Sequence, residues 1–266
     1  MPEGDTLHRT AFVVDRALRG EVVTRVEVVE ARHAELPRRI EGRAVVRVEA
    51  RGKNLLVGLD DGSTVWSHLR MTGSWHVYAP GEPWQRPTRQ RSVALHTARS
   101  VAVGFNLPAL EWLDAVRLAR HPVLAALGPD LLAPEPDLSA AVARLRAVPL
   151  VALGEALLDQ RLVAGIGNVY KSEVLFLLGL DPFAPVAAFD DATLHRILAR
   201  ARAEMQRNLD GRPRRTRHDL GSSRLFVYGR GGRPCARCKG LVAMHRQGDA
   251  GWSTYWCPSC QKSSDT

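Results

Sequence analysis

Four cysteines near the end of the sequence are the feature that most constrains how this chain can fold. They form two pairs, Cys235-x2-Cys238 and Cys257-x2-Cys260, with eighteen residues between the pairs. Thiolates at this spacing match a tetrahedral Zn²⁺ site in which each C-x-x-C makes one knuckle of a β-hairpin. Two disulfides are the alternative, which the absence of a secretion signal disfavours. We therefore expect one structural Zn²⁺ that holds a hairpin and takes no part in chemistry.

Positive charge is concentrated in and just before this cysteine region. The formal net charge is +9, and residues 207–246 alone contain eleven Lys or Arg against two Asp, also a net of +9. This excess indicates a polyanionic partner, although residues 212–217 by themselves would also suit a solvated basic loop. No run is long and apolar enough for a membrane span, and the polar, acidic start argues against a signal peptide. We expect a cytoplasmic, nucleoid-associated protein without membrane contact.

The N-terminal residues Met1-Pro2-Glu3 offer an unusual nucleophile. Removal of Met1 would expose the secondary amine of Pro2, and an α-amino group has a reference pKa of about 7.7–8.0, so much of it is neutral near pH 7. The amine would become an iminium on condensation with an aldehyde carbon, and the Glu3 carboxyl would lie beside it. Many chains begin with Met-Pro for no catalytic reason, so the rest of the sequence has to decide.

The hydrophobic pattern changes twice along the chain and predicts an α+β protein. An amphipathic helix follows Asp5, which could cap it, and ends at Gly20; short alternating or β-branched runs then predict an antiparallel β-sandwich. A Pro-rich stretch suggests a linker, and the helical period follows it. The expected strands are 22–29, 44–48, 54–59, 64–69, 74–78, 92–96 and 101–105, and the later helices 139–146, 153–160, 168–178 and 191–208. The expected domains are 1–127, a linker 128–138, a helical domain 139–232 and a zinc finger 233–266.

Between two of the predicted helices lies the turn Gly165-Ile166-Gly167-Asn168. Two glycines let the backbone approach a ligand closely, and the following helix would present its N-terminal amides to a phosphate. Asn168 could either cap that helix or donate its amide to the phosphate. The turn is not a dinucleotide-binding fingerprint, because it joins two helices and lacks the third glycine.

Taken together, the Pro2-Glu3 start, the Gly-Ile-Gly-Asn turn and the four cysteines resemble one family of bacterial enzymes. They are similar to the DNA glycosylase/AP lyases of the formamidopyrimidine-DNA glycosylase and endonuclease VIII family. The resemblance covers essentially the whole chain in the right order. It implies an N-terminal helix, a β-sandwich, a helix-two-turn-helix motif and a zinc finger.

The resemblance also implies roles for single residues. Pro2 would attack C1′ of the damaged nucleotide, Glu3 would protonate the sugar ring oxygen, and Lys53 would contact the phosphate at the lesion and assist catalysis. Met71, with Arg70 beside it in the segment 67–73, would fill the gap left by the extruded base. From the residues alone, Lys53 could equally be an ordinary hairpin lysine and Met71 a loop or core methionine.

Four features, compared with the family pattern, either mark the endonuclease VIII branch or leave a question open. The Met-Pro-Glu-Gly start and the lack of Pro-Arg-Arg-Phe in residues 103–109 both favour that branch, whereas Asp5 and Thr6 stand where a second glutamate is frequent. Trp252 occupies the finger position at which the family normally has a phosphate-binding arginine. We hypothesise that Arg246 or His245 reaches the same phosphate instead.

The function that the resemblance implies is removal of oxidised bases, pyrimidines above all, followed by β,δ-elimination at the abasic site. The partner would be damaged DNA, double-stranded or partly single-stranded, bound by a monomer with no small-molecule cofactor. Alternatives are an 8-oxoguanine/formamidopyrimidine glycosylase, a damaged-DNA-binding protein of the same fold without activity, and a zinc-ribbon RNA-binding protein, which would not explain Pro2-Glu3 with Lys53.

Overall fold

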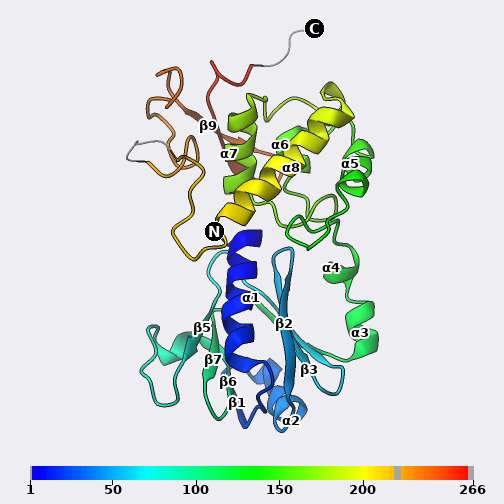
Figure 1. Ribbon diagram of the computed structural model, residues 1–266, viewed down its shortest axis with the longest axis vertical. Coiled ribbons are helices and arrows are strands. Elements are labelled where there is room, and N and C mark those ends of the chain that lie inside the picture. Colours follow the sequence, from blue (N-terminus) through cyan, green and yellow to red (C-terminus); the bar gives the residue numbers. More distant parts are fainter. Residues whose placement is uncertain (1, 219–222, 263–266) are drawn as a thin grey trace. The chain divides into compact units, whose positions relative to one another are not determined.

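The computed structural model describes residues 2–218 and 223–262, and its chain divides into two compact units, Met1–Ala126 and Leu127–Thr266 (Figure 1). Met1, the residue whose removal the proline nucleophile requires, lies outside the described residues. No helix in the described part of the chain is long and apolar enough to cross a membrane.

Two four-stranded antiparallel sheets form the first unit. One sheet has the strand order β1-β6-β7-β5 and the other β2-β3-β4-β8. Side chains from both sheets meet in one hydrophobic core, as the predicted sandwich requires. The strands are β1 (Arg25–Val28), β2 (Val45–Arg51), β3 (Asn54–Leu59), β4 (Thr64–His68), β5 (Ser74–Tyr78), β6 (Arg91–His96), β7 (Val101–Phe105) and β8 (Ala109–Leu113).

Helix α1 (Gly4–Leu18) closes one side of this core and lies along β2 (Figure 1). Its apolar stripe, Leu7, Ala11, Val14 and Leu18, is buried in the same core as the strands, which explains why a short N-terminal helix is stably held. Asp5 lies inside the first turn, and the N-cap position belongs to Glu3, so the expectation that Asp5 caps the helix was wrong. Short helical segments complete the unit: η1 (Ala31–His33), α2 (Leu36–Ile40), η2 (Thr88–Gln90), α3 (Ala115–Ala119) and α4 (Pro122–Ala125).

The second unit is helical in its first part. Its helices are α5 (Leu138–Arg146), α6 (Leu153–Ala156), α7 (Asn168–Leu178), η3 (Val186–Ala188) and α8 (Asp191–Arg207), and they share one hydrophobic core. Leu131, in the stretch 128–138 that the sequence suggested as a linker, is buried in this core. Helix α7 is buried on every side from Asn168 to Phe176, which makes it the central element of the unit.

A two-stranded antiparallel hairpin, β9 (Ala243–Gln247) and β10 (Trp252–Trp256), follows the helices. It packs against α7, and Phe176 of that helix shares a small core with Val227, Val242, Cys235 and Cys257. The predicted fold class is thus confirmed: an N-terminal helix with antiparallel sheets, a helical region, and a C-terminal cysteine cluster with β-strands.

Candidate functional site

The N-terminal residues of the candidate site are fixed by the first turn of α1. Glu3 has an extended backbone with φ −126°, and its carbonyl accepts a hydrogen bond from the Leu7 amide at 3.1 Å. Glu3 is 0% exposed, whereas Pro2 is half-buried. If Met1 is removed, this buried carboxyl would lie beside a half-buried terminal proline, which is a suitable arrangement for proton transfer at an amine nucleophile.

Lys53 lies in a two-residue hairpin between β2 and β3. Gly52 has φ +57°, a conformation that favours glycine, and Arg51 pairs with Asn54 across the turn. The Asn54 side chain donates to the Arg51 carbonyl at 2.9 Å and accepts from the Trp66 indole N–H at 3.0 Å. Both Asn54 and Trp66 are buried, so the backbone that carries the Lys53 ammonium is held rigidly.

His68 was not among the predicted site residues, although it lies opposite Asn54 on β4 and close to Lys53. Burial, together with the positive charges of Lys53 and Arg70, lowers the pKa of His68 to about 4. Its Nδ1 accepts from the Arg70 backbone N–H at 3.0 Å, so the neutral ring carries its proton on Nε2. His68 is therefore a neutral donor next to Lys53. The available sequence signal was a histidine inside the segment 67–73, three residues before Met71.

Met71 lies at the tip of the loop between β4 and β5 and is 61% exposed. The loop is tight: the Gly73 amide donates to the Leu69 carbonyl at 2.8 Å, and a Cβ on Gly73 would come within 2.6 Å of that oxygen. Arg70 has φ +44°, which a non-glycine residue rarely adopts. The buried Leu69 anchors the turn, and the turn places the Met71 side chain in solvent. Met71 is therefore not a core residue.

Asn168 is the first residue of α7 and follows Gly167, whose backbone is extended at the N-cap position. Gly165 has φ +103°, so the turn requires a glycine there. The Asn168 amide nitrogen donates to the Ser253 carbonyl of β10 at 2.7 Å, and the side chain is only 3% exposed. Its Oδ1 has no hydrogen-bond partner among the described residues. Asn168 thus joins the helix N-terminus to the finger hairpin.

Two further α7 side chains that the sequence did not single out bind the finger region. The Lys171 ammonium donates to Thr254 Oγ1 at 2.6 Å, and Thr254 Oγ1 donates to Gln247 Oε1 at 2.7 Å. Glu173 accepts from the backbone amides of Phe226, Val227 and Tyr228, each at 2.8 Å, and from the Thr216 hydroxyl. These groups are buried and charged or polar, so they fix where the finger lies on α7.

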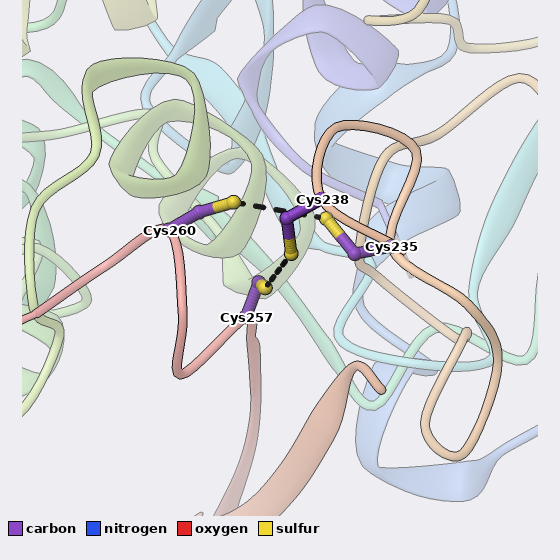
Figure 2. A group of neighbouring side chains, drawn as sticks. All are labelled: Cys235, Cys238, Cys257 and Cys260. Carbon is purple, nitrogen blue, oxygen red and sulfur yellow. Dashed lines mark hydrogen bonds between the residues drawn. The ribbon is translucent and has the colours of Figure 1, made fainter. Parts of the chain in front are cut away.

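The four cysteines converge as the spacing predicted (Figure 2). Their sulfur atoms all lie within 4.8 Å of one another, with Cys235 to Cys260 at 3.9 Å and Cys238 to Cys257 at 3.4 Å. In a tetrahedron with Zn–S bonds of about 2.3 Å, neighbouring sulfurs are about 3.8 Å apart. The donor set and its spacing therefore fit one tetrahedral metal ion.

Three residues of the finger hairpin bear on the position at which the family has an arginine. They are Arg246, His245 and Trp252. Arg246 is exposed, and one of its guanidinium nitrogens donates to the Gly251 carbonyl at 2.8 Å within the hairpin turn. The His245 ring lies edge-on to Phe183 with ring centroids 6.0 Å apart. Trp252 is 39% exposed on β10. That Arg246 or His245 binds a phosphate stays a prediction.

The candidate residues are divided between the units. Pro2, Glu3, Lys53, Arg70 and Met71 belong to the first unit, and Asn168, Arg246 and the cysteines to the second. Within the first unit, the structure brings His68 next to Lys53. Within the second, it brings Asn168 and Lys171 to adjacent residues of β10.

Both units match family models. Residues 1–108 match the formamidopyrimidine-DNA glycosylase N-terminal domain, and residues 127–217 match the formamidopyrimidine-DNA glycosylase H2TH domain. Solved structures with a similar fold include the Lactococcus lactis formamidopyrimidine-DNA glycosylase bound to DNA with an N7-benzyl-Fapy-dG, with a TM-score of 0.83 and 23% identity over 98% of this chain and 100% of that one. The same protein bound to DNA with an abasic site gives a TM-score of 0.82 at 23% identity, again over 98% and 100% of the two chains.

Curated relatives are similar over nearly their whole length. A "probable endonuclease 8 2" of Streptomyces coelicolor is 47% identical over 98% of this chain and 94% of its own. A "DNA-(apurinic or apyrimidinic site) lyase Nei2" of Mycolicibacterium smegmatis is 41% identical over 99% of this chain and 100% of its own. An "endonuclease 8" of Salmonella enteritidis is 32% identical over 98% and 100% of the two chains.

Proposed function

Because the chain belongs to the formamidopyrimidine-DNA glycosylase family, as a bifunctional DNA glycosylase and abasic-site lyase of base excision repair, we propose that its Pro2 amine is the nucleophile of both reactions. The observation that carries the proposal is the Pro2-Glu3 start, with Glu3 fully buried at the first turn of α1. Once Met1 is removed, the amine would belong to a half-buried residue with an acid beside it, as nucleophilic catalysis at a sugar carbon requires.

The chemistry begins with a damaged base that has been turned out of the helix, a step that costs a few kcal/mol and least for a base that already pairs badly. The Pro2 nitrogen attacks C1′ as the glycosidic bond breaks and the base leaves with that electron pair. The attacking nitrogen loses its proton and Glu3 delivers one to the ring oxygen. The C1′–O4′ bond then opens, and the freed nitrogen lone pair forms an iminium.

The iminium acidifies the C2′ proton, whose loss expels the 3′ phosphate by β-elimination. A second elimination expels the 5′ phosphate and leaves a one-nucleotide gap with phosphate at both ends. The Lys53 ammonium, which a rigid hairpin holds in place, would neutralise charge on the phosphate at the lesion. Hydrolysis of the final Schiff base returns the free amine.

Damaged DNA is the proposed partner, contacted at four places in the chain besides Pro2 and Lys53. Asn168 at the α7 N-terminus would bind a phosphate, Arg70 would contact the backbone beside Met71, and Met71 would occupy the gap left by the extruded base. Arg246 on the exposed side of the finger would reach a further phosphate. Because Lys53, Arg70 and Arg246 would each bring a positive charge to the phosphate backbone, affinity should fall with salt.

Zinc is the metal that we propose for the cysteine cluster, with Cys235, Cys238, Cys257 and Cys260 as its ligands. When bound, it would supply folding free energy to the finger and no reacting group. The position of β9 and β10, and with it the position of Arg246, depends on the two knuckles.

The test is to follow cleavage of an abasic duplex and identify the ends produced. The zinc-loaded enzyme should leave 3′- and 5′-phosphate ends in the presence of EDTA, and Pro2→Gly should lose the lyase. Glu3→Gln should lose base removal and keep part of the lyase on a preformed abasic site, because that site is already an aldehyde. Retained full activity in Pro2→Gly would refute the proposed nucleophile.

For the substrate, we propose oxidised pyrimidines, because the Met-Pro-Glu-Gly start and the residues at 103–109 resemble the endonuclease VIII branch, and relatives at 47% and 39% identity carry the name endonuclease 8. A panel of thymine glycol, dihydrouracil and 8-oxoguanine duplexes should give the higher kcat/KM for the two pyrimidines. A higher value for 8-oxoguanine would move the protein to the purine-directed branch. Binding of all three without cleavage would identify a damaged-DNA-binding protein.

A further inference from the structure

The segment 207–224, between the end of α8 and the finger, carries positive charge that the reaction above does not use. It contains six arginines and two aspartates, a net of +4. In the sequence, its stretch 212–217 also suits a solvated loop, which would have no fixed binding site. In the structure, which describes this segment except for residues 219–222, four of the arginines line one cavity of about 530 Å³: Arg207, Arg212, Arg215 and Arg224.

Hydrogen bonds hold the backbone of this segment in a fixed place. The Asn208 side chain is 4% exposed and binds Arg215 twice: its Oδ1 accepts from the Arg215 N–H at 2.7 Å, and its Nδ2 donates to the Arg215 carbonyl at 2.8 Å. The Arg224 carbonyl accepts from the Thr216 amide at 3.1 Å. The Thr216 hydroxyl donates to the buried Glu173 carboxylate of α7. The cavity arginines therefore project from a backbone that is attached to α8 and to α7.

Two of the cavity arginines already have carboxylate partners. The fully buried Glu204 forms ion pairs with Arg200 at 2.9 Å and with Arg207 at 3.0 Å. Asp210, which also lines the cavity, accepts from the Arg212 backbone N–H at 3.0 Å and pairs with the Arg212 guanidinium at 3.6 Å. These pairs leave the other two arginines of the cavity, at positions 215 and 224, to be accounted for.

Arg215 and Arg224 are both exposed, and neither guanidinium has a hydrogen bond or an ion pair with another residue that the structure describes. Asp219, which lies outside the described residues, could neutralise at most one of the two charges. A guanidinium presents a planar fork of N–H donors that matches the oxygens of a phosphate. The cavity thus offers a phosphate at least one guanidinium charge that no carboxylate neutralises.

The attachment of the segment to α7 indicates where such a phosphate comes from. The Arg214 guanidinium, next in the chain to Arg215, lies 5.0 Å from the ring centroid of Tyr170. Tyr170 is two residues after Asn168, the proposed phosphate ligand at the start of α7. The cavity and Asn168 thus belong to the same unit and are attached to the same helix. A DNA strand carries a phosphate at every nucleotide, so a strand bound at Asn168 has further phosphates to offer.

We propose that Arg215 and Arg224 bind a backbone phosphate of the DNA other than the one at Asn168. The proposal rests on the proposed function in that its ligand is DNA. A phosphate contact carries no information about the base, so the cavity adds affinity for damaged and undamaged duplexes alike. It leaves the lyase step unchanged.

The double variant Arg215→Gln/Arg224→Gln tests the site. Because both side chains are exposed, the Tm and the zinc content should stay at the wild-type values. The Kd for a duplex with a reduced, uncleavable abasic site should rise about tenfold at low salt, as loss of a charge-assisted contact implies, and by the same factor for an undamaged duplex. The slope of log K against log salt concentration should become shallower by about 1, the value for one phosphate. The single-turnover lyase rate at saturating enzyme should not change.

Two further double variants are the controls. Arg38→Gln/Arg196→Gln makes the same change in net charge at two exposed arginines outside the cavity. It should shift the Kd by less than twofold and keep the salt slope. Arg215→Lys/Arg224→Lys keeps both charges and loses the planar forks, so its salt slope should equal that of wild type and its Kd should lie between those of wild type and the glutamine variant.

Three results would overturn the inference: an equal loss of affinity in Arg38→Gln/Arg196→Gln, an unchanged salt slope in Arg215→Gln/Arg224→Gln, or a loss of affinity that parallels a loss of Tm. A rise in Tm with inorganic phosphate that the glutamine variant lacks, at unchanged DNA affinity, would also overturn it, because the cavity would then bind a free anion. Cleavage of an ordinary abasic duplex by wild type, run in parallel, tests the proposed function separately. Arginine-dependent DNA binding without cleavage would support the phosphate site and refute the proposed lyase.

Discussion

At the scale of the residue, the candidate site depends on side chains whose properties come from their surroundings. Lys53 is a hairpin lysine in the sequence, but the hydrogen bonds of the buried Asn54 hold its hairpin rigid, and the neighbouring His68 is neutral because burial and the charges of Lys53 and Arg70 lower its pKa to about 4. Local motifs single out Pro2 and Asn168, whereas Lys53 stands out only through the family resemblance, and the roles of all three stay predictions. His68 and Lys171 could not be singled out from the sequence, because what matters about them is burial and, for Lys171, a partner 83 residues away in the chain.

The pKa of His68 gives a prediction about stability and pH. The pKa of His68 in the folded protein, about 4, lies below the ordinary histidine value of 6.5, so the unfolded chain binds the proton first as the pH falls. This contribution to stability is complete above about pH 6.5 and is lost toward pH 4, at a cost of about 2 kcal/mol between pH 7 and 5. Urea unfolding at both pH values should show this loss, and His68→Asn should lose about 2 kcal/mol less than wild type over the same interval. An equal loss in both proteins would contradict the assignment.

Met71 gives a prediction that separates function from stability. Because the side chain is 61% exposed, Met71→Ala should change the free energy of unfolding by less than about 0.5 kcal/mol. It should still lower kcat/KM for a lesion in duplex DNA about tenfold or more, because the gap left by the base is no longer filled. Val116→Ala removes an equally exposed apolar group, 62% exposed, and should leave activity unchanged. Equal kcat/KM values for Met71→Ala and Val116→Ala would show that Met71 has no role at the site.

At the scale of the element, α7 is the part that joins the helical region to the finger. Its span, Asn168–Leu178, agrees with the predicted 168–178 because a glycine precedes it and Gly179, with φ +72°, ends it. Other bounds were less predictable. The helix expected at 153–160 ends at Ala156, since turns that place the Gly-Ile-Gly-Asn segment take over there. Strand β8 was missed because its five residues alternate only weakly between buried and half-buried.

A substitution of Glu173 tests how much the contacts between α7 and the segment before the finger hairpin contribute to stability. Its carboxylate accepts from three consecutive amides, at residues 226–228, and from the Thr216 hydroxyl. Glu173→Gln would turn an NH₂ group toward donors and leave a buried amide unpaired, so we expect a loss of about 2–3 kcal/mol in the free energy of unfolding. Glu135→Gln, at an exposed loop carboxylate, is the control and should change stability little. Denaturant titrations of wild type and both variants measure the free energies of unfolding. If the unfolding midpoint of Glu173→Gln equals that of Glu135→Gln, the Glu173 contacts contribute little to stability.

Removal of the metal tests the finger as an element. Cys257 is fully buried, and Cys257→Ser would withdraw one of four thiolates and lower the metal affinity. We expect wild type to contain one zinc per chain by metal analysis, and Cys257→Ser to contain far less and to bind abasic DNA at least tenfold more weakly. Ser259→Ala, between the last two cysteines, should keep zinc and affinity. Tight DNA binding without zinc would contradict a finger that holds DNA.

At the scale of the whole molecule, the order of elements was the most predictable property. The helix, the sandwich, the helical region and the cysteine hairpin follow each other along the chain, and each has its own hydrophobic period or ligand spacing. What the sequence could not give is the polar network around α7, since Lys171, Thr254, Gln247 and Glu173 find partners across 43 to 83 residues. Such contacts depend on the folded geometry and leave no local pattern.

The proposed mechanism depends on the Pro2 amine. The most direct measurement is to trap the covalent intermediate between enzyme and DNA and to find the residue to which the sugar is attached. Wild-type enzyme with abasic DNA and borohydride should give one stable adduct, and mass spectrometry of its proteolytic peptides should locate the sugar on the N-terminal peptide that begins at Pro2. The same protein with Met1 retained or with an N-terminal tag should give none. An adduct on Lys53 or any other lysine, or an adduct of equal yield with Met1 in place, would contradict the central claim.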